Sequence, residues 1–408
     1  MQSNGAVRLP AVALLLLGAP LAACFRPAID DGAFACGSAG CPPGTLCDRT
    51  GVCRADGPDS GENVVLAAAR NDNATELHAL CDGEVRLVNR LNFAQDGQTL
   101  SWGDSNLDGV PSLAVATTGD VLRVLDLRGD VVDETQRIPA VQTARCASWH
   151  DADGDGDLDL GVADRTHSIK VFDFDDGQLS PQWDTDEMIQ PWGLAWGDVD
   201  GDGAADLVVG GSGDAVAVYH NAGASFERGW VSPRAEDTRA VALADVDGDG
   251  DLDLAVGSRA VPVRIYTNDK GQFRETWTAI EIADASGLDF GDVDGDGDPD
   301  LAVAGRNEPS RVYRNDGGVF APIWAAPEPR DSFSVSWFDV DGDGDLDLTV
   351  GNSAATSRVY RNDAGVLSDW IDLGLDGARD LEWARWPAPA GSVSACDAAA
   401  WEASPLAE

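Results

Sequence analysis

Short clusters of aspartate recur along this chain, and the spacing within each cluster is that of a cation-binding loop. The stretch 245–253 reads DVDGDGDLD, which places carboxylates at alternate positions with glycines among them. In a tight loop, the carboxylates at positions one, three and five converge, the glycines let the backbone curl, and position nine returns a further carboxylate. Hard oxygen ligands of this kind suit Ca²⁺ and do not suit Zn²⁺. The spacing therefore predicts a calcium-binding loop.

Five complete loops of this kind follow one another, and their first aspartates are 47 residues apart. The ligands predicted at positions one, three, five and nine are Asp151, Asp153, Asp155 and Asp159; Asp198, Asp200, Asp202 and Asp206; Asp245, Asp247, Asp249 and Asp253; Asp292, Asp294, Asp296 and Asp300; and Asp339, Asp341, Asp343 and Asp347. Position seven varies, as expected where only its backbone carbonyl binds the metal. An earlier loop keeps Asp104, Asn106 and Asp108 but has Ser112 at position nine, so we expect it to bind weakly or not at all. The sequence thus predicts about five structural Ca²⁺ sites.

Two other interpretations fit the clusters less well than calcium loops do. An EF-hand needs an acidic ligand at position twelve and a helix on each side. Position twelve is valine every time, at Val115, Val162, Val209, Val256, Val303 and Val350. Solvated acidic turns without a metal are the second alternative, but carboxylates this close repel and raise one another's pKa. The EF-hand is excluded and the bare acidic turn is disfavoured.

The segments around each loop repeat with the same period. A strand ending in a large apolar residue precedes each loop, at Trp102, Trp149, Trp196, Leu243, Phe290 and Trp337. An apolar strand such as 254–257 follows the loop, then a second strand such as 264–269, an Asn/Asp/Gly turn and a less regular strand around Trp277. Each unit therefore holds four short strands, and a repeat of this length is typical of propeller blades.

These units resemble FG-GAP/VCBS repeats, the blades of integrin-α-type β-propellers, over about residues 63–386. Phe290 and Gly291 keep the FG pair, whereas the GAP element has become GSR at 257–259 and AGR at 304–306. Six loops define six complete blades, and the segments 63–85 and 379–386 supply the strands of one more. We therefore expect an all-β, seven-bladed propeller with four-stranded blades, closed by pairing of the N- and C-terminal segments. Closure hides edge strands that otherwise invite aggregation.

The N-terminal segment indicates export. Residues 1–23 have Arg8 before an apolar core and small residues before Cys24, which is typical of a secretory signal. Residues 21–24 resemble a bacterial lipobox, which implies acylation of Cys24 and anchoring in the cell envelope, at the outer membrane or cell surface. An ordinary signal peptide with an incidental cysteine remains the alternative.

A cysteine-rich module is predicted at 24–56, followed by a linker at 57–62; residues 387–408 form a tail after the propeller. Cys36, Cys41, Cys47 and Cys53 lie within eighteen residues with Gly and Pro between them, as in small disulfide-stapled modules. We favour the pairs Cys36–Cys47 and Cys41–Cys53 among the three possible, with a zinc site as the alternative. A bond between Cys81 and Cys396 would staple the closure of the ring.

Six of the 28 Lys and Arg residues of this chain occupy two repeat positions. With 28 Lys+Arg against 71 Asp+Glu, the net charge of −43 disfavours nucleic acid or anionic lipid as a surface partner. Arg165, Arg259 and Arg306 share one position, and Arg145, Trp192, Arg239, Phe333 and Arg379 share another; both fall on the face opposite the metal loops. These side chains could bind a protein or an anionic carbohydrate. The alternative is local pairing with Asp164, Asp237 or Asp380.

No constellation of catalytic residues accompanies the loops. The four histidines fall at unrelated repeat positions and form no triad, and His150 is interpreted as a loop neighbour of Asp151. Tyr219, Tyr266, Tyr313 and Tyr360 share one strand position as core residues, although tyrosine and histidine are the usual bases of carbohydrate lyases. The sequence thus favours a surface-anchored binding or adhesion module; a propeller enzyme of the lyase or dehydratase type acting on polysaccharide is the alternative.

Overall fold

The computed structural model consists of β-strands and the turns between them. It describes residues 62–387 apart from 73, 82–83, 94–96, 106–110, 118, 129–130, 142, 166–167, 176, 186, 188–189 and 224, together with the short strands β1 (Phe34–Ala35), β2 (Thr45–Cys47), β3 (Val52–Ala55) and β30 (Glu402–Ala403). The described part contains no helix, and so none that could cross a bilayer. Strands β1, β3 and β2 pair in that order, and β30 lies parallel to β10. The predicted all-β class is confirmed.

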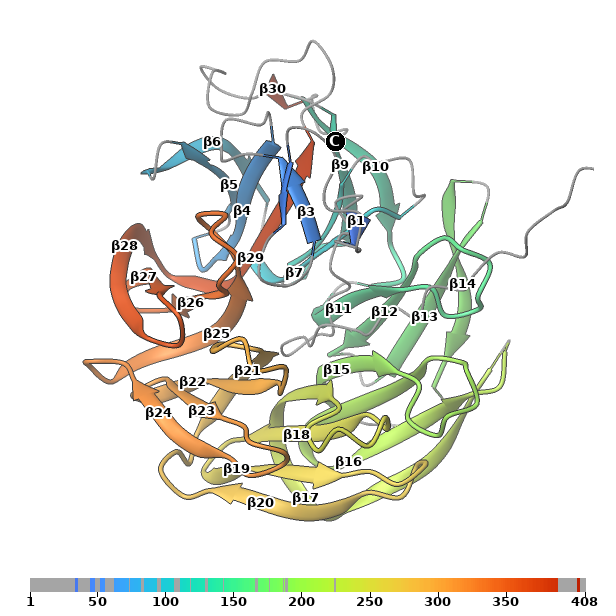
Figure 1. Cartoon of the computed structure of the whole chain (residues 1–408). Helices are drawn as coiled ribbons and strands as arrows, with labels where there is room; N and C mark the ends of the chain where they lie inside the picture. Colours follow the sequence, from blue (N-terminus) through green and yellow to red (C-terminus); the bar gives the residue numbers. More distant parts are fainter. Residues whose placement is uncertain are drawn as a thin grey trace, which may run out of the picture.

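The other strands form antiparallel sheets arranged in a ring (Figure 1). The first half of the ring contains β4 (Glu62–Arg70), β5 (Ala74–Cys81), β6 (Glu84–Asn92), β7 (Gly97–Gly103), β8 (Ser112–Thr117), β9 (Leu122–Arg128), β10 (Val131–Ile138), β11 (Ala144–His150), β12 (Asp159–Asp164), β13 (Ser168–Asp175), β14 (Gln178–Asp184), β15 (Pro191–Gly197) and β16 (Asp206–Asn221). The second half contains β17 (Phe226–Ala244), β18 (Asp253–Ser258), β19 (Val261–Thr267), β20 (Arg274–Ala279), β21 (Ala285–Gly291), β22 (Asp300–Glu308), β23 (Arg311–Arg314), β24 (Ala321–Ala325), β25 (Arg330–Phe338), β26 (Asp347–Asn352), β27 (Thr356–Asn362), β28 (Leu367–Asp376) and β29 (Ala378–Pro387).

Two sheets consist of four strands alone, and elsewhere in the ring the four-stranded groups that the repeat predicts are extended or joined into larger sheets. The sheet β11-β12-β13-β14 is one example, with His150 opposite Asp159 at the loop end and Ala144 opposite Asp164 at the other end. Strand β17 runs through two sheets, because its first half pairs with β16 and its second half, from Thr238, pairs with β18. Neighbouring sheets also join where Arg306 of β22 lies opposite Asp331 of β25.

The first strands of the repeats line the centre of the ring. Strands β7, β11, β15, β17, β21, β25 and β29 each contact the next, and β29 contacts β7. The indole Nε1 of Trp149 donates to the carbonyl of Ser101 in β7 at 3.1 Å, and Trp196 makes the same bond to Ser148 in β11. A Cβ on Gly103 would lie 2.7 Å from Trp149, so only glycine leaves room for this indole. These two indoles therefore bind β11 and β15 each to the inner strand before it.

The two ends of the ring meet in one sheet, with the order β29-β4-β5-β6. Trp383 of β29 lies opposite Leu66 of β4, and the pairing extends from Ala378 to Pro387. The predicted pairing of the N- and C-terminal segments is confirmed. The fourth strand of this sheet runs on to Asn92, beyond the 63–85 segment assigned to it from the sequence. Cys24, Cys36, Cys41 and Cys396 lie outside the described residues, as do the side chains of Cys47 and Cys53, so lipidation and disulfide pairing stay predictions.

Acidic loops and an arginine-lined mouth

Each aspartate loop connects the first and second strands of a sheet, so all of the loops lie at the same end of the strands. Among the described residues, three carboxylate oxygens from positions one, three and nine lie within 4.8 Å of one another in three loops: Asp151, Asp153 and Asp159; Asp245, Asp247 and Asp253; Asp292, Asp294 and Asp300. In the fourth, Asp198, Asp200 and Asp202 come together in the same way. This donor set of converging carboxylates fits Ca²⁺.

Glycines and backbone N–H groups hold the loop in shape. Gly248 and Gly250 have φ values of 75° and 96°, a region that favours glycine. The position-one carboxylate of Asp245 accepts the N–H groups of Gly248 at 2.8 Å and Gly250 at 3.0 Å. The position-five carboxylate of Asp249 accepts the N–H of Asp251 at 2.9 Å. The predicted ligands therefore have their orientation fixed by the loop backbone itself.

The position-nine carboxylate is buried in every complete loop. The Oδ2 of Asp253 accepts the N–H of Val246 at 2.9 Å, and its Oδ1 accepts the N–H of Asn268 at 2.7 Å. The same two bonds recur at Asp159, Asp206, Asp300 and Asp347. Burial raises the pKa of Asp253 to about 7, and a cation beside it would favour the ionised form. Position nine thus ties its loop to the end of the third strand, which the spacing alone did not predict.

Position seven does more than offer a carbonyl. The carboxylate of Asp251 accepts the N–H of Lys270 at 3.0 Å, in the turn after β19. Asp298 and Asp345 make the equivalent bonds to Gly317 and Ala364 at 2.8 and 2.9 Å. In these three loops the side chain at position seven also binds the turn, while metal binding by its backbone carbonyl stays a prediction.

An asparagine in the same turn joins each loop to the loop before it. The Nδ2 of Asn268 donates to the carbonyl of Val199, in the preceding loop, at 2.7 Å. Asn221, Asn315 and Asn362 make the same bond to Ala152, Val246 and Val293 at 2.6–2.7 Å. The sequence showed the asparagines only as turn residues, and their reach to the neighbouring sheet was missed.

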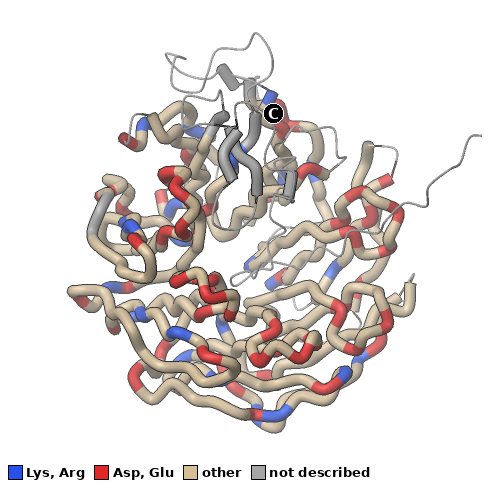
Figure 2. The backbone as a smooth tube through the Cα atoms, viewed as in Figure 1, with Lys and Arg blue, Asp and Glu red and all other residues tan. Residues whose placement is uncertain are grey.

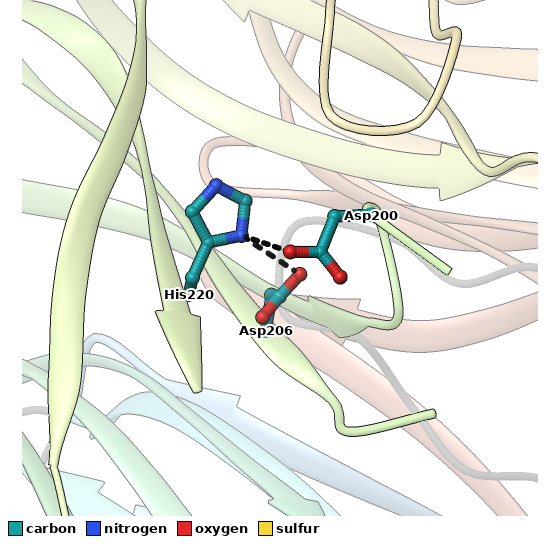
Figure 3. Close-up of side chains that lie close together, drawn as sticks. All are labelled: Asp200, Asp206 and His220. Atoms are coloured by element: carbon teal, nitrogen blue, oxygen red, sulfur yellow. Dashed lines mark hydrogen bonds and ion pairs between the residues drawn. The ribbon is translucent and has the colours of Figure 1, made fainter. Parts of the chain in front are cut away.

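The loops differ in the charge of one strand residue that lies beside them. The residue 22 places after position one is Asp173, His220, Thr267, Arg314 or Arg361. The Nδ1 of His220 lies 3.2 Å from Oδ2 of Asp200 and 3.3 Å from Oδ2 of Asp206 (Figure 3). A nitrogen and two carboxylate oxygens form a ligand set that first-row transition ions also accept. From the sequence, the histidines were placed at unrelated repeat positions. An alignment of the repeats, which puts His220 at the position of Arg314 and Arg361, could have shown that it lies beside a loop.

The arginines at this position compete with any cation for the carboxylates. The Nε of Arg361 lies 3.2 Å from Asp341, and its guanidinium reaches Asp343 at 3.3 Å. Arg314 lies 3.9 Å from Asp294. Asp173 instead adds a carboxylate beside its loop, and burial and the nearby Asp153 and Asp155 raise its pKa.

The first, incomplete loop has Ser112 bonded to Asp126 at 2.9 Å, while its predicted ligands Asn106 and Asp108 lie outside the described residues.

The opposite end of the strands carries the predicted arginines and aromatic residues. Each first strand has an irregular register with one bulged residue near its start, and a bulge of this kind turns its side chain out of the regular alternation. The bulged residues are Gln98, Arg145, Trp192, Arg239, Ser286, Phe333 and Arg379. All of them line one cavity of about 90 Å³ at the mouth of the ring, with Thr99, Arg306, Ser334 and Asp380. The sequence missed Gln98 and Ser286, which the 47-residue spacing could have found.

Cation–π contacts hold the arginine side chains of the mouth in place. The guanidinium carbons of Arg145 and Arg239, on the strands flanking β15, each lie 4.0 Å from the ring centroid of Trp192. Arg306 lies 4.2 Å from the ring of Phe333. Local ion pairs with aspartate, the alternative interpretation of these arginines, are present for two of them. Arg239 lies 2.8 Å from Asp237, and Arg306 lies 2.7 Å from Asp331.

Two predicted residues stand apart from the cavity. Arg165 is exposed and does not line it, and neither does Arg259, which is exposed and 3.9 Å from Asp237. Basic positions, in blue in Figure 2, are few among the acidic ones in red around the ring. The cations lining the mouth are therefore Arg145, Arg239, Arg306 and Arg379.

The candidate bases lie away from the mouth. Tyr219, Tyr266, Tyr313 and Tyr360 are each at most 4% exposed, which confirms them as core residues. His150 stacks on Trp196 with ring centroids 5.7 Å apart, and burial lowers its pKa to about 4, so the ring is neutral. Neither residue type lines the cavity in the described part of the chain.

The strand pattern and the loops agree with a known repeat family. Residues 151–209, 198–256, 247–303 and 292–350 match the FG-GAP-like repeat. The chain is an FG-GAP-like repeat protein over residues 151–350. No curated protein matches the sequence.

Several solved structures are similar to this FG-GAP protein at low sequence identity. The periplasmic gluconolactonase of Pseudomonas aeruginosa has a TM-score of 0.57 and 14% identity, over 79% of this chain and 99% of that one. A lectin of Agrocybe aegerita that recognises non-reducing terminal N-acetylglucosamine has a TM-score of 0.51 and 15% identity, over 79% of this chain and 95% of that one. At these identities the likeness establishes the fold alone.

Proposed function

We propose that this protein is a calcium-stabilised, surface-anchored binding or adhesion module with seven blades. In this proposal an acyl group on Cys24 holds it in the bacterial cell envelope, and Ca²⁺ fills the complete aspartate loops. The ligand, an anionic carbohydrate or an acidic group of a protein, binds at the mouth on the face opposite the metal loops.

The observation that carries the proposal is the convergence of cations at this mouth. Four arginines line one cavity in a chain whose net charge is −43. Guanidinium groups recognise carboxylate, sulfate and phosphate through paired N–H donors. A ring of irregular strand starts turns these side chains to one point, as bulges do beside binding sites.

The loops support the calcium part of the proposal. Three carboxylate oxygens within 4.8 Å of one another repel unless a cation or protons compensate them. Each complete loop lies between two paired strands and bonds to a third, so an ion there would stiffen its sheet. Loops of exported modules bind Ca²⁺ with dissociation constants of about 0.1–1 mM.

A propeller enzyme acting on polysaccharide is the second candidate. The gluconolactonase and the lectin show that this fold hosts catalysis in one protein and sugar recognition in another. The mouth of this chain offers arginine, aromatic, amide and hydroxyl groups, and its one carboxylate, Asp380, accepts the N–H of Leu100 at 2.9 Å. Without a tyrosine or histidine at the cavity, binding is favoured over catalysis.

Screening of the purified full chain against glycan and protein arrays, with calcium and with EDTA, tests the proposal. We expect capture of acidic ligands in calcium and a lower melting temperature with reduced capture in EDTA. Identical melting under chelation would remove the calcium part, and no selective capture would remove the binding part. Membrane fractionation tests the anchor, since Cys24→Ser should move the protein to the soluble fraction.

A further inference from the structure

Arg145 differs from two other cations at the mouth in having no described carboxylate in contact with it. Arg239 pairs with Asp237 and Arg306 with Asp331, whereas no carboxylate contacts Arg145 among the described residues. Its one hydrogen bond is to Oε1 of Gln98, at 2.9 Å. Burial, and then Arg165, Arg379 and Arg239, lower the pKa of Arg145 to about 10. A bound anion would offset the repulsion between a guanidinium and the other guanidiniums around it when no carboxylate does so.

The aromatic residues of the mouth hold arginines and do not form a platform for a sugar. Trp192 has the guanidinium groups of Arg145 and Arg239 each 4.0 Å from its ring centroid. Phe333 has Arg306 at 4.2 Å and Arg379 at 5.7 Å. A guanidinium stacked on a ring keeps its N–H donors free in its own plane. The rings therefore position donors at the cavity, and ligand stacking on them would require the arginines to leave.

The size of the cavity limits what enters it. A cavity of about 150 Å³ accommodates benzene, whereas each bound water needs roughly 10–15 Å³. The mouth offers about 90 Å³, which is enough for one small polar group and too little for a sugar ring. A ligand larger than this must present one group to the cavity while the rest stays outside.

We propose that the mouth binds a single oxyanion group, a carboxylate, sulfate or phosphate, that projects end-on from the ligand and is held by Arg145 together with Arg239. This inference rests on the proposed binding function and narrows it to one chemical group. Gln98, whose Oε1 also accepts from Arg379 at 3.4 Å, positions the guanidinium of Arg145.

Calorimetric titration of the full-length protein at constant ionic strength tests the inference. The probes are glucuronate, inorganic sulfate, inorganic phosphate and neutral glucose, which separate a pendant carboxylate from a free oxyanion. We expect the anions to bind and glucose not to, and Arg145→Gln to weaken anion binding about tenfold or more with an unchanged melting temperature. Arg86→Gln, at an exposed site on β6 with the same charge change, should bind as the wild type does.

The outcomes separate this inference from the proposed function. If Arg145→Gln lowers the melting temperature, the variant Arg145→Lys, which keeps the charge, replaces it in the test. Full loss of anion binding by a folded Lys variant would then support binding through the paired N–H donors of arginine. Glucose binding as tightly as glucuronate overturns the inference. So does acidic-ligand capture on the arrays that Arg145→Gln leaves intact, although the binding function then stands. If the wild type captures no ligand on any array, both this inference and the proposed binding function are wrong.

Discussion

The side-chain amide of Asn268 donates to the backbone carbonyl of Val199, 2.7 Å away in the loop of the preceding sheet. The backbone N–H of Asn268 donates to Asp253 of its own loop, and the N–H of Val199 donates to Asp206 of the other. One asparagine therefore links the buried carboxylates of two neighbouring loops. The bond occurs four times along the ring, so the five complete loops form one continuous hydrogen-bonded chain.

Asn268→Ala should weaken the coupling between the loops at 198 and 245. The change leaves the buried carbonyl of Val199 without a donor, which costs about 1–3 kcal/mol of unfolding free energy. Under the proposed calcium binding, filling one loop orders its neighbour, so calorimetric calcium titration of the variant should show a lower Hill coefficient. Asn92→Ala, at an exposed end of β6, is the control and should change neither quantity. Equal Hill coefficients in both variants would show that the loops fill independently.

Calcium-stripped protein should become more stable as the pH falls from about 8 to about 5. Burial raises the pKa of Asp253, Asp300 and Asp347 to about 7 in the folded chain, from 3.8. In this window the folded state holds more protons than the unfolded state, so the free energy of unfolding decreases as pH rises. With saturating calcium the slope should reverse, because protons then compete with the ion. Melting temperatures across the range measure both slopes, and the same slope with and without calcium would contradict the assignment of these carboxylates as ligands.

The metal loops could be predicted from sequence because their ligands are close along the chain. Position nine lies eight residues from position one, and this local spacing fixes which side chains converge. The bond from Asn268 to Val199 joins residues 69 apart, and only the packing of one sheet on the next brings them together. The contact of His220 with Asp200 depends on the pairing of strands within one sheet. Contacts of this range leave their trace in the repeat alignment and not in any local motif.

The mouth was predictable as a set of positions and not as a cavity. The spacing placed Arg145, Trp192 and Arg239 together because they occupy equivalent places in three repeats. It could not show that the two arginines cover the ring of Trp192, since that depends on side-chain orientation at the bulges. Arg379, 46 residues after Phe333, still joins the set because β29 has its bulge at that residue.

Arg361→Thr should raise the calcium affinity of the loop at 339–347. The guanidinium lies 3.2 Å from Asp341 and 3.3 Å from Asp343, so it holds carboxylates that an ion needs. The ion pair is 42% exposed on the arginine side, so we expect a severalfold effect of about 0.2–1 kcal/mol. The reciprocal variant Thr267→Arg should weaken the loop at 245–253 by a similar factor. Calcium titration of both proteins measures this, and a shift of the same sign in both would refute competition by the arginine.

Trp102→Phe should loosen the ring at the junction of the chain ends. The indole Nε1 of Trp102 donates to the carbonyl of Glu382 in β29 at 3.2 Å, and phenylalanine removes this donor from the buried carbonyl. The loss should cost about 1–3 kcal/mol. Because β29 is the last strand of the ring, its opening frees the pairing with β4, so amide exchange should accelerate in both strands. Trp149→Phe removes the same kind of bond, to Ser101, between sheets that are adjacent in sequence, and is the matched control. Hydrogen exchange that rises in β29 and β4 in both variants alike would show that the junction is no weaker than any other contact between sheets.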